Sequence, residues 1–269
     1  MRCALTTWPS HPSSILGEKL SKSKQDALDQ NATDHLVATA KAGLSAVPLV
    51  GSLLSELAAS LIPHQRTDRI VDFARKLESR LGDLDQDQLR NKLMDENFTD
   101  LVEESALQAV RGVTDERRGY VASLLAAGIS DERISFVESR HLLRILGEVN
   151  DIEIVWLRYF IAPHHGADVE FKKKNRAVLE TVSVPVYVNA PPDRTASEKA
   201  ALRANYLAHL VSLGLLDRRY KLRANGEPQF DKHTNQFAFS YQISTLGRML
   251  LNRIGLTTSD GQPIETPAS

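Results

Sequence analysis

The chain has 269 residues, of which 42% are hydrophobic and 25% are charged, a composition that suits a globular protein of one large or two small domains. Its net charge of -1 argues against nucleic-acid binding by bulk electrostatics, although a local basic patch is compatible with it. The single cysteine, Cys3, excludes an internal disulfide framework and is typical of a reducing compartment. No secretory signal pattern is evident, so we expect a cytoplasmic protein.

The first 63 residues divide into a polar part and an apolar part. Residues 1–32 are rich in turn-forming and polar types, and we expect a flexible arm there. Residues 42–63 carry a single charge, Glu56, and are long enough in principle to cross a bilayer. Pro48 in the middle argues against one transmembrane helix, and predicts two short helices instead.

This apolar hairpin, residues 42–63, has two interpretations. Its leucines either pack in the protein core or against a second copy, or they contact a membrane, which would place the protein at the periphery of the inner membrane. Small residues in the hairpin would allow close helix packing in both cases. The predicted membrane or oligomer contact is a row of five leucines: Leu49, Leu53, Leu54, Leu57 and Leu61.

Amphipathic patterns predict further helices over residues 64–83, 85–96 and 98–110. In the first of these, the apolar positions fall on one side and charged residues surround them. The inward-facing positions are Ile70, Phe73, Ala74, Leu77 and Leu81. No convincing strand pattern occurs before Pro163, so we expect an all-α domain over residues 33–163.

Residues 114–163 contain the clearest start and stop signals for helices. Thr114 is a candidate N-cap, and Gly128 is the expected end of the helix that it begins. Ser130 is the expected start of the next helix, with a buried row of Ile134, Val137, Leu142, Ile145 and Val149. Asn150 and Glu153 then form a capping-box pattern before a helix that is apolar nearly all round.

The pattern changes after residue 163. Residues 164–174 have the composition of a surface connection, and residues 182–189 favour a strand. Thr195 is the expected N-cap of a helix that ends at Gly214, with Glu198 completing a capping box. Apolar and polar residues then alternate on both sides of a loop with Asn225 and Gly226, which predicts a β-hairpin.

A final helix after Thr245 completes the order helix, hairpin, helix, which resembles winged-helix domains. We therefore expect a mainly α fold: a helical bundle, then a winged-helix-like unit containing a β-hairpin over residues 164–255, and a disordered tail over residues 256–269. A winged-helix protein that binds DNA places a helix in the groove and basic residues near phosphates. The candidates for nucleic-acid contact are Arg203, Arg218, Arg219, Lys221 and Arg223.

Catalytic and metal motifs are weak throughout the chain. His164 and His165 are adjacent and point apart, so they do not form a convincing metal site with Asp168. Arg158 and His164 have a spacing seen in helical ribonucleases of the HEPN class, which makes a ribonuclease a remote alternative. We predict no catalytic, cofactor-binding or metal-binding residue and no small-molecule cofactor.

One resemblance extends beyond the C-terminal unit. Four segments resemble bacterial abortive-infection alpha proteins. They are the apolar segment at residues 48–54, the segments at residues 98–104 and 115–121, and the terminal Tyr241-Gln242-Ile243-Ser244-Thr245-Leu246-Gly247. The resemblance covers residues 40–255. It implies a non-enzymatic protein of phage defence that acts through a protein partner, self-association or a membrane. A winged-helix DNA-binding regulator is the alternative from the residues themselves.

Overall fold

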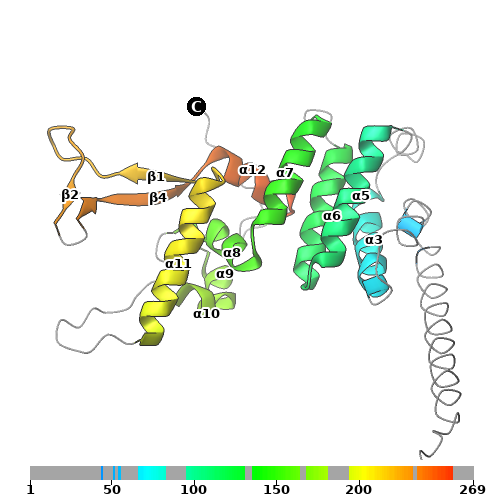
Figure 1. The fold of residues 1–269 in the computed structure, drawn as a ribbon, viewed down its shortest axis with the longest axis horizontal. Helices are drawn as coiled ribbons and strands as arrows, with labels where there is room; N and C mark the ends of the chain where they lie inside the picture. The colour runs from blue at the N-terminus through cyan, green and yellow to red at the C-terminus, as the bar shows by residue number, and fades with distance from the viewer. Residues whose placement is uncertain are drawn as a thin grey trace, which may run out of the picture.

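The computed structural model describes Leu44, Gly51, Leu54, Ser55 and residues 66–82, 95–130, 135–163, 168–180, 194–232 and 235–256. In these ranges the protein is mainly helical, with an antiparallel β-ribbon near the C-terminus (Figure 1). The predicted mainly α fold with a helical bundle and a C-terminal hairpin is confirmed. The described ranges before residue 163 contain no strand.

Among the described residues, four helices form the bundle, with α6 in contact with each of the other three (Figure 1). They are α3 (Thr67–Leu81), α5 (Glu96–Arg111), α6 (Asp115–Ser130) and α7 (Phe136–Glu148). The inward face predicted for α3 is confirmed, because all five apolar positions are buried. Such burial of apolar side chains is the main stabilising contribution in a bundle.

The predicted junction between α6 and α7 is wrong by several residues. Gly128 does not end α6, which continues to Ser130. Instead, a Cβ at Gly128 would lie 2.9 Å from Oγ of Ser139, so this glycine allows α7 to approach α6 closely. The helix α7 is capped by Ser135 rather than Ser130, and Glu138 completes its capping box. Val137 is exposed rather than buried.

The second group of helices packs around α8 and connects the bundle to the ribbon. Its members are α8 (Asp151–Tyr159), α9 (Val169–Lys174), α10 (Arg176–Leu179), α11 (Arg194–Ser212) and α12 (Thr245–Arg253). The capping box of Asn150 and Glu153 is confirmed. Two predictions here are wrong: α9 occupies part of the expected surface connection, and α11 begins at Arg194, so Thr195 lies inside the helix.

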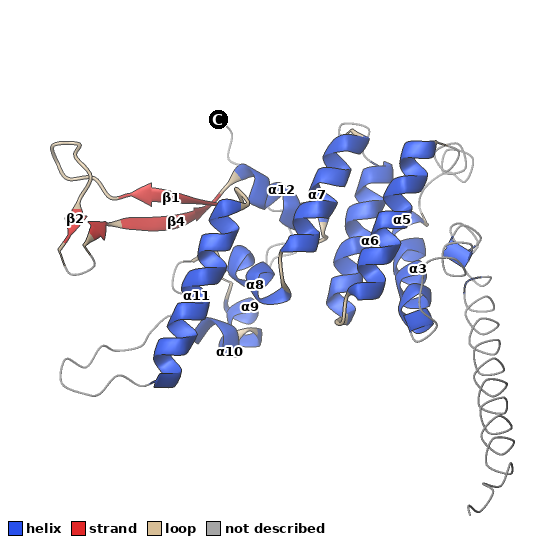
Figure 2. Cartoon of the chain, in the orientation of Figure 1, coloured by secondary structure: helices blue, strands red, loops and turns tan. Residues whose placement is uncertain are grey.

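The β-ribbon projects from the helices on the side of α11 (Figure 2). Its base consists of β1 (Leu216–Tyr220) and β4 (Phe239–Ile243), which pair with Leu216 opposite Ile243 and Tyr220 opposite Phe239. Gly214, with a φ of 71°, ends α11 in the left-handed conformation and turns the chain into β1. The predicted hairpin and the predicted stop at Gly214 are both confirmed.

The end of the ribbon is more complex than one turn. A small loop closes at the bridge between Leu222 and Pro228, and β2 (Phe230–Asp231) pairs with β3 (Gln236–Phe237) in a second small hairpin. The loop, the second hairpin and the base meet in a cycle of three backbone hydrogen bonds. Lys221 donates to Ala238 at 2.8 Å, Ala238 to Gln229 at 2.7 Å, and Gln229 to Lys221 at 2.8 Å.

Most of the apolar hairpin at residues 42–63 lies outside the described residues, including Leu49, Leu53, Leu57 and Leu61. Both of its described leucines, Leu44 and Leu54, are completely buried in the same apolar core as α3. Four other predicted segments also lie wholly or mostly outside the described residues. They are the arm at residues 1–32, nearly all of the helix at 85–96, the strand at 182–189 and the tail from 257. Among the helices that are described, none combines the length and apolar composition needed to span a membrane.

Candidate nucleic-acid interface and adjoining cavity

The two faces of the β-ribbon have different chemistry, because successive side chains of a strand point to opposite sides. Arg218 and Tyr220 of β1 share one face with Phe239 and Tyr241 of β4, as their ring and cation contacts show. The opposite face carries Asp217 and Arg219 of β1 and the small or neutral Ser240 and Gln242 of β4. One side of the ribbon is therefore aromatic and the other is polar.

Arg219 lies on the polar side of the ribbon, and Lys221 and Arg223 follow at the same two-residue spacing beyond the end of β1. All three are exposed. None of them forms an ion pair with a described residue. We call these three residues the basic edge. They remain available to an anionic partner, since no carboxylate of the described residues pairs with them.

The structure separates the other two predicted nucleic-acid contacts from the basic edge. Arg218 lies on the aromatic face, where its guanidinium carbon is 5.2 Å from the centroid of Phe239. Arg203 belongs to α11, and its guanidinium carbon lies 5.0 Å from the ring centroid of Trp156 on α8. Arg203 is thus a packing contact between α8 and α11 as well as a cation.

The charge of the chain is distributed unevenly. Residues 194–256 contain ten Lys and Arg residues against four Asp and Glu residues, whereas the whole chain has a net charge of -1. The unit that contains α11, the ribbon and α12 is therefore basic, and the remainder of the chain is acidic. This asymmetry is the usual electrostatic feature of a nucleic-acid-binding module within a larger protein.

A continuous row of eight aromatic rings connects the helices to the end of the ribbon. Neighbouring ring centroids are 5.2 to 6.5 Å apart, and the rings meet edge to face. In order along the row, the rings are Trp156, Tyr159, Phe160, Tyr241, Phe239, Tyr220, Phe237 and Phe230. The alternation of Phe237, Phe239 and Tyr241 was visible in the sequence, but their contact with Phe160 depends on the tertiary fold.

A buried polar contact fixes α11, and hence the ribbon, to α8. Nδ1 of His209 lies 2.8 Å from Oε1 of Glu153, whose side chain is buried. The other carboxylate oxygen of Glu153 accepts the backbone N–H of Asn150 at 2.8 Å, which completes the capping box. The sequence predicted Glu153 as a cap and gave no signal that the same carboxylate would contact α11.

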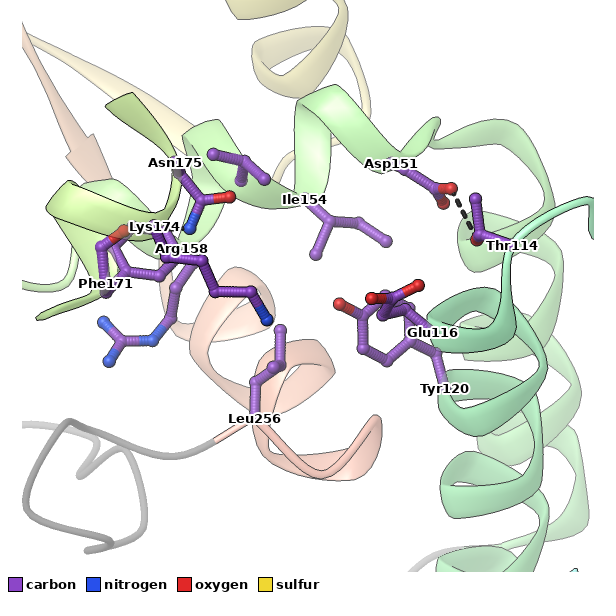
Figure 3. Close-up of a pocket in the computed structure, with 11 residues that line it drawn as sticks. Thr114, Glu116, Tyr120, Asp151, Ile154, Arg158, Phe171, Lys174, Asn175 and Leu256 are labelled. Carbon is purple, nitrogen blue, oxygen red and sulfur yellow. Dashed lines mark hydrogen bonds between the residues drawn. The ribbon is translucent and has the colours of Figure 1, made fainter. Parts of the chain in front are cut away.

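A cavity of about 260 Å³ lies between α6, α8 and α9, close to the end of α12 (Figure 3). Ile154, Phe171 and Leu256 supply apolar lining, while charged groups face it from two sides. Glu116 and Asp151 lie on one side, and the ammonium group of Lys174 points toward the space from the other. A cavity of this kind suits a small molecule that carries one positive and one negative group.

Most polar groups around the cavity already have partners within the protein. Thr114 donates a hydrogen bond to Asp151 at 2.8 Å, and Arg117 lies 3.7 Å from the same carboxylate. Burial raises the pKa of Tyr120, and the negative charges of Asp151 and Glu116 raise it further. Tyr120 therefore remains a neutral hydrogen-bond donor at physiological pH.

The residues of the remote ribonuclease alternative are not brought together among the described residues. Arg158 is buried, forms an ion pair with Asp168 and stacks on Phe171 with a distance of 5.0 Å to the ring centroid. His164 lies outside the described residues. Arg158 thus has a structural role that joins α8 to α9. In the described parts of the chain, no group of three or more His, Cys, Asp or Glu side chains is placed to hold a metal ion.

No protein-family model, curated protein or solved structure matches this chain. Of the two sites the ribbon is the stronger candidate, because it combines exposure, projection from the helices and cations that form no ion pair with a described residue. The cavity has fewer free polar groups and no nucleophile paired with a base among its lining residues.

Proposed function

We propose that this protein binds nucleic acid through its C-terminal unit, with the ribbon acting as the wing of a winged-helix-like module. The observation that supports this most directly is the basic edge of Arg219, Lys221 and Arg223, exposed on a ribbon that projects from the helices. Cations in this arrangement contact backbone phosphates and release bound counterions, which favours association.

The helix α11 supplies the second element of the proposed interface. Only Leu207 and Leu210 of its 19 residues are buried, and Lys199 is among the exposed ones. A helix with such a large exposed surface fits the major groove of duplex DNA, while the wing lies along the neighbouring phosphates. The contact between Glu153 and His209 holds this helix in place relative to α8.

Fluorescence anisotropy with a labelled duplex DNA at several salt concentrations tests the proposal. The triple variant Arg219→Ala, Lys221→Ala, Arg223→Ala should bind at least about tenfold more weakly at low salt. Its affinity should also depend less steeply on salt, by about one unit of log–log slope for each phosphate contact that is lost. Absence of duplex binding by the unaltered protein at low salt would rule out a duplex ligand, and absence of binding to single strands as well would overturn the proposal.

A matched control separates the basic edge from net charge. Arg75, Arg111 and Arg144 are exposed on α3, α5 and α7, away from the ribbon. Their simultaneous replacement by alanine removes the same three charges from the bundle. This control variant should retain the affinity and salt dependence of the unaltered protein, and an equal loss in both variants would contradict a role for the ribbon.

A second candidate function concerns the apolar hairpin at residues 42–63. It is the action implied by the resemblance to abortive-infection alpha proteins: a non-enzymatic bacterial defence protein whose hairpin is packed at rest and contacts a partner, a second copy or the inner membrane when released. The complete burial of Leu44 and Leu54 supports the packed resting form. Exposure of such leucines would cost about 1.5 to 3 kcal/mol each, which release would have to offset.

Leakage of dye from vesicles of phosphatidylethanolamine and phosphatidylglycerol tests this second candidate. The unaltered protein should cause leakage, and the variant Leu53→Asp, Leu57→Asp should cause much less, because two carboxylates in the leucine row oppose insertion into lipid. Equal leakage from both proteins, or none from either, counts against a membrane role.

A further inference from the structure

The end of the ribbon carries a dense group of exposed apolar side chains. Tyr220, Leu222, Phe230 and Phe237 expose 52%, 62%, 41% and 49% of their surface. All four lie within 18 consecutive residues, whereas the other large exposed hydrophobic residues of the described chain are scattered over several helices and one connection. A cluster of this kind on a projecting element marks a contact surface, because single exposed apolar residues are ordinary but groups are not.

The rings of this cluster contact one another and Phe239 edge to face. Phe237 meets Tyr220 with a centroid distance of 6.5 Å and Phe230 with one of 5.5 Å, and Tyr220 meets Phe239 at 6.2 Å. The cycle of hydrogen bonds among Lys221, Gln229 and Ala238 fixes the backbone beneath them. Because the rings already pack against one another, a partner that stacks on them has to order fewer side chains, and binding costs less conformational entropy.

The charges around the rings decide which partner fits them. Arg218 lies on the aromatic face itself, and the basic edge begins at Arg219 on the same strand and continues beyond the end of β1. An apolar protein surface or the interior of a lipid bilayer would have to remove water from these cations without neutralising them, which is costly. A partner that offers both flat apolar groups and negative charges satisfies the rings and the cations together.

We propose that the aromatic face formed by Arg218, Tyr220, Phe230 and Phe237 binds unpaired bases, so that the ligand is single-stranded nucleic acid or a strand with unpaired bases beside a duplex. Bases stack on the exposed rings while phosphates meet Arg218 and the basic edge. This inference rests on the proposed function and specifies its ligand, because duplex DNA keeps its bases stacked and offers them no route to the rings.

The experiment compares the affinity for labelled 12-nucleotide oligo(dT) and oligo(U) with the affinity for a duplex. The variant Tyr220→Leu, Phe237→Leu keeps apolar surface and all charges but lacks two rings. It should bind both single strands at least about tenfold more weakly and the duplex with nearly unchanged affinity. Val137→Ser, which alters an exposed apolar residue on α7 in the bundle, is the matched control and should change single-strand binding less than about twofold.

A spectroscopic variant reports stacking directly. Phe237→Trp should keep single-strand affinity, and its added tryptophan fluorescence should be quenched by oligo(dT), as a base stacked on an indole requires. Equal single-strand affinity for the double-leucine variant and the unaltered protein would show that the rings do not bind bases. Failure of the tryptophan to respond to bound oligo(dT) would count equally against stacking.

The failures of the two proposals are distinguishable. Binding to the duplex without binding to either single strand would leave the basic edge supported and reject the stacking surface, whereas binding to neither rejects both. Sedimentation tests whether a second copy of the protein occupies this face, and vesicle co-flotation tests whether lipid does. A dimer or a vesicle-bound form that Tyr220→Leu, Phe237→Leu abolishes would reassign the surface to self-association or lipid and overturn the inference.

Discussion

His209 of α11 and Glu153 of α8 meet side chain to side chain, with 2.8 Å between Nδ1 and Oε1. The two residues are 56 positions apart in the sequence, and Glu153 is at the same time the acidic member of a capping box. One carboxylate therefore starts α8 and holds the helix that leads into the ribbon. Its second role explains why Glu153 is buried, unlike Glu138 in the capping box of α7.

We expect Glu153→Ala to lower the free energy of unfolding by about 3 kcal/mol, because it removes a helix cap and leaves His209 and the N–H of Asn150 without their buried acceptor. Glu153→Gln, which can still accept the N–H of Asn150, should cost about 1 kcal/mol. Urea denaturation followed by circular dichroism measures both values.

Glu138→Ala is the matched control, since it removes the acidic member of the exposed capping box. It should cost about 0.5 to 1 kcal/mol. Equal losses for Glu138→Ala and Glu153→Ala would mean that the contact with His209 contributes nothing beyond the cap.

Tyr120 gives the protein a pH dependence on the alkaline side. Burial, followed by the charges of Asp151 and Glu116, raises its pKa above the value of about 10 in the unfolded chain. The folded state then retains a proton that the unfolded state has lost, so stability is full below about pH 10 and falls as the pH rises toward the folded pKa. Tyr120→Phe should remove this part of the alkaline loss.

Thermal melts between pH 8 and 11 measure the difference between the two proteins. The midpoint of Tyr120→Phe relative to the unaltered protein should rise with pH over the upper part of this range and stay constant below it. A constant difference throughout would show that Tyr120 titrates as it does in the unfolded chain.

The sequence predicted the local features of this fold better than the contacts between distant elements. Three confirmed predictions depend on patterns of residues close in the chain. They are the capping box of Asn150 and Glu153, the helix end at Gly214 and the alternation within β1 and β4. The signal for Ser135 was also present, because Glu138 follows three residues later. Ser130 has no acidic residue three positions later. Asp131 and Glu132 follow it directly, however, and they resemble the acidic first turn of a helix.

The candidate site could not be derived in the same way. The alternation of side chains assigns Arg218 and Arg219 to opposite faces once the strand is known, but Arg203 stacks on Trp156 only because α11 packs against α8. Likewise, the three-way junction at the end of the ribbon joins Lys221, Gln229 and Ala238 through backbone groups that carry no sequence signature. These contacts depend on tertiary packing, which residue patterns do not specify.

Gly247 shows a close approach that only glycine allows. A Cβ at this position would lie 2.4 Å from the carbonyl oxygen of Leu215, which belongs to the backbone at the base of the ribbon. We expect Gly247→Ala to displace α12 from β1 and to lower the free energy of unfolding by about 3 kcal/mol. Chemical denaturation measures the loss, and weaker single-strand or duplex binding should accompany it if the ribbon shifts.

Gly82→Ala is the corresponding control, because the only described atom that its added Cβ would meet is the carbonyl oxygen of Glu78, at an ordinary contact distance of 3.7 Å. Its φ of -57° is open to any residue. The change should be neutral or stabilise the protein by about 0.5 kcal/mol through the unfolded state. A loss as large as that of Gly247→Ala would indicate that glycine at these helix ends matters for flexibility rather than for space.

Leu54 decides how the apolar hairpin behaves in solution. Its side chain is completely buried together with Phe73 and Leu77 in one apolar cluster, so Leu54→Ala should lower the free energy of unfolding by about 3 kcal/mol. Leu202→Ala removes the same atoms from an exposed position on α11 and should change stability by less than about 0.5 kcal/mol. If the two variants are equally stable, the hairpin contributes nothing to the core of the free protein, and its leucines are already available to a partner or a membrane. If Leu54→Ala alone is destabilised, any action of the hairpin outside the protein requires a prior step that releases it.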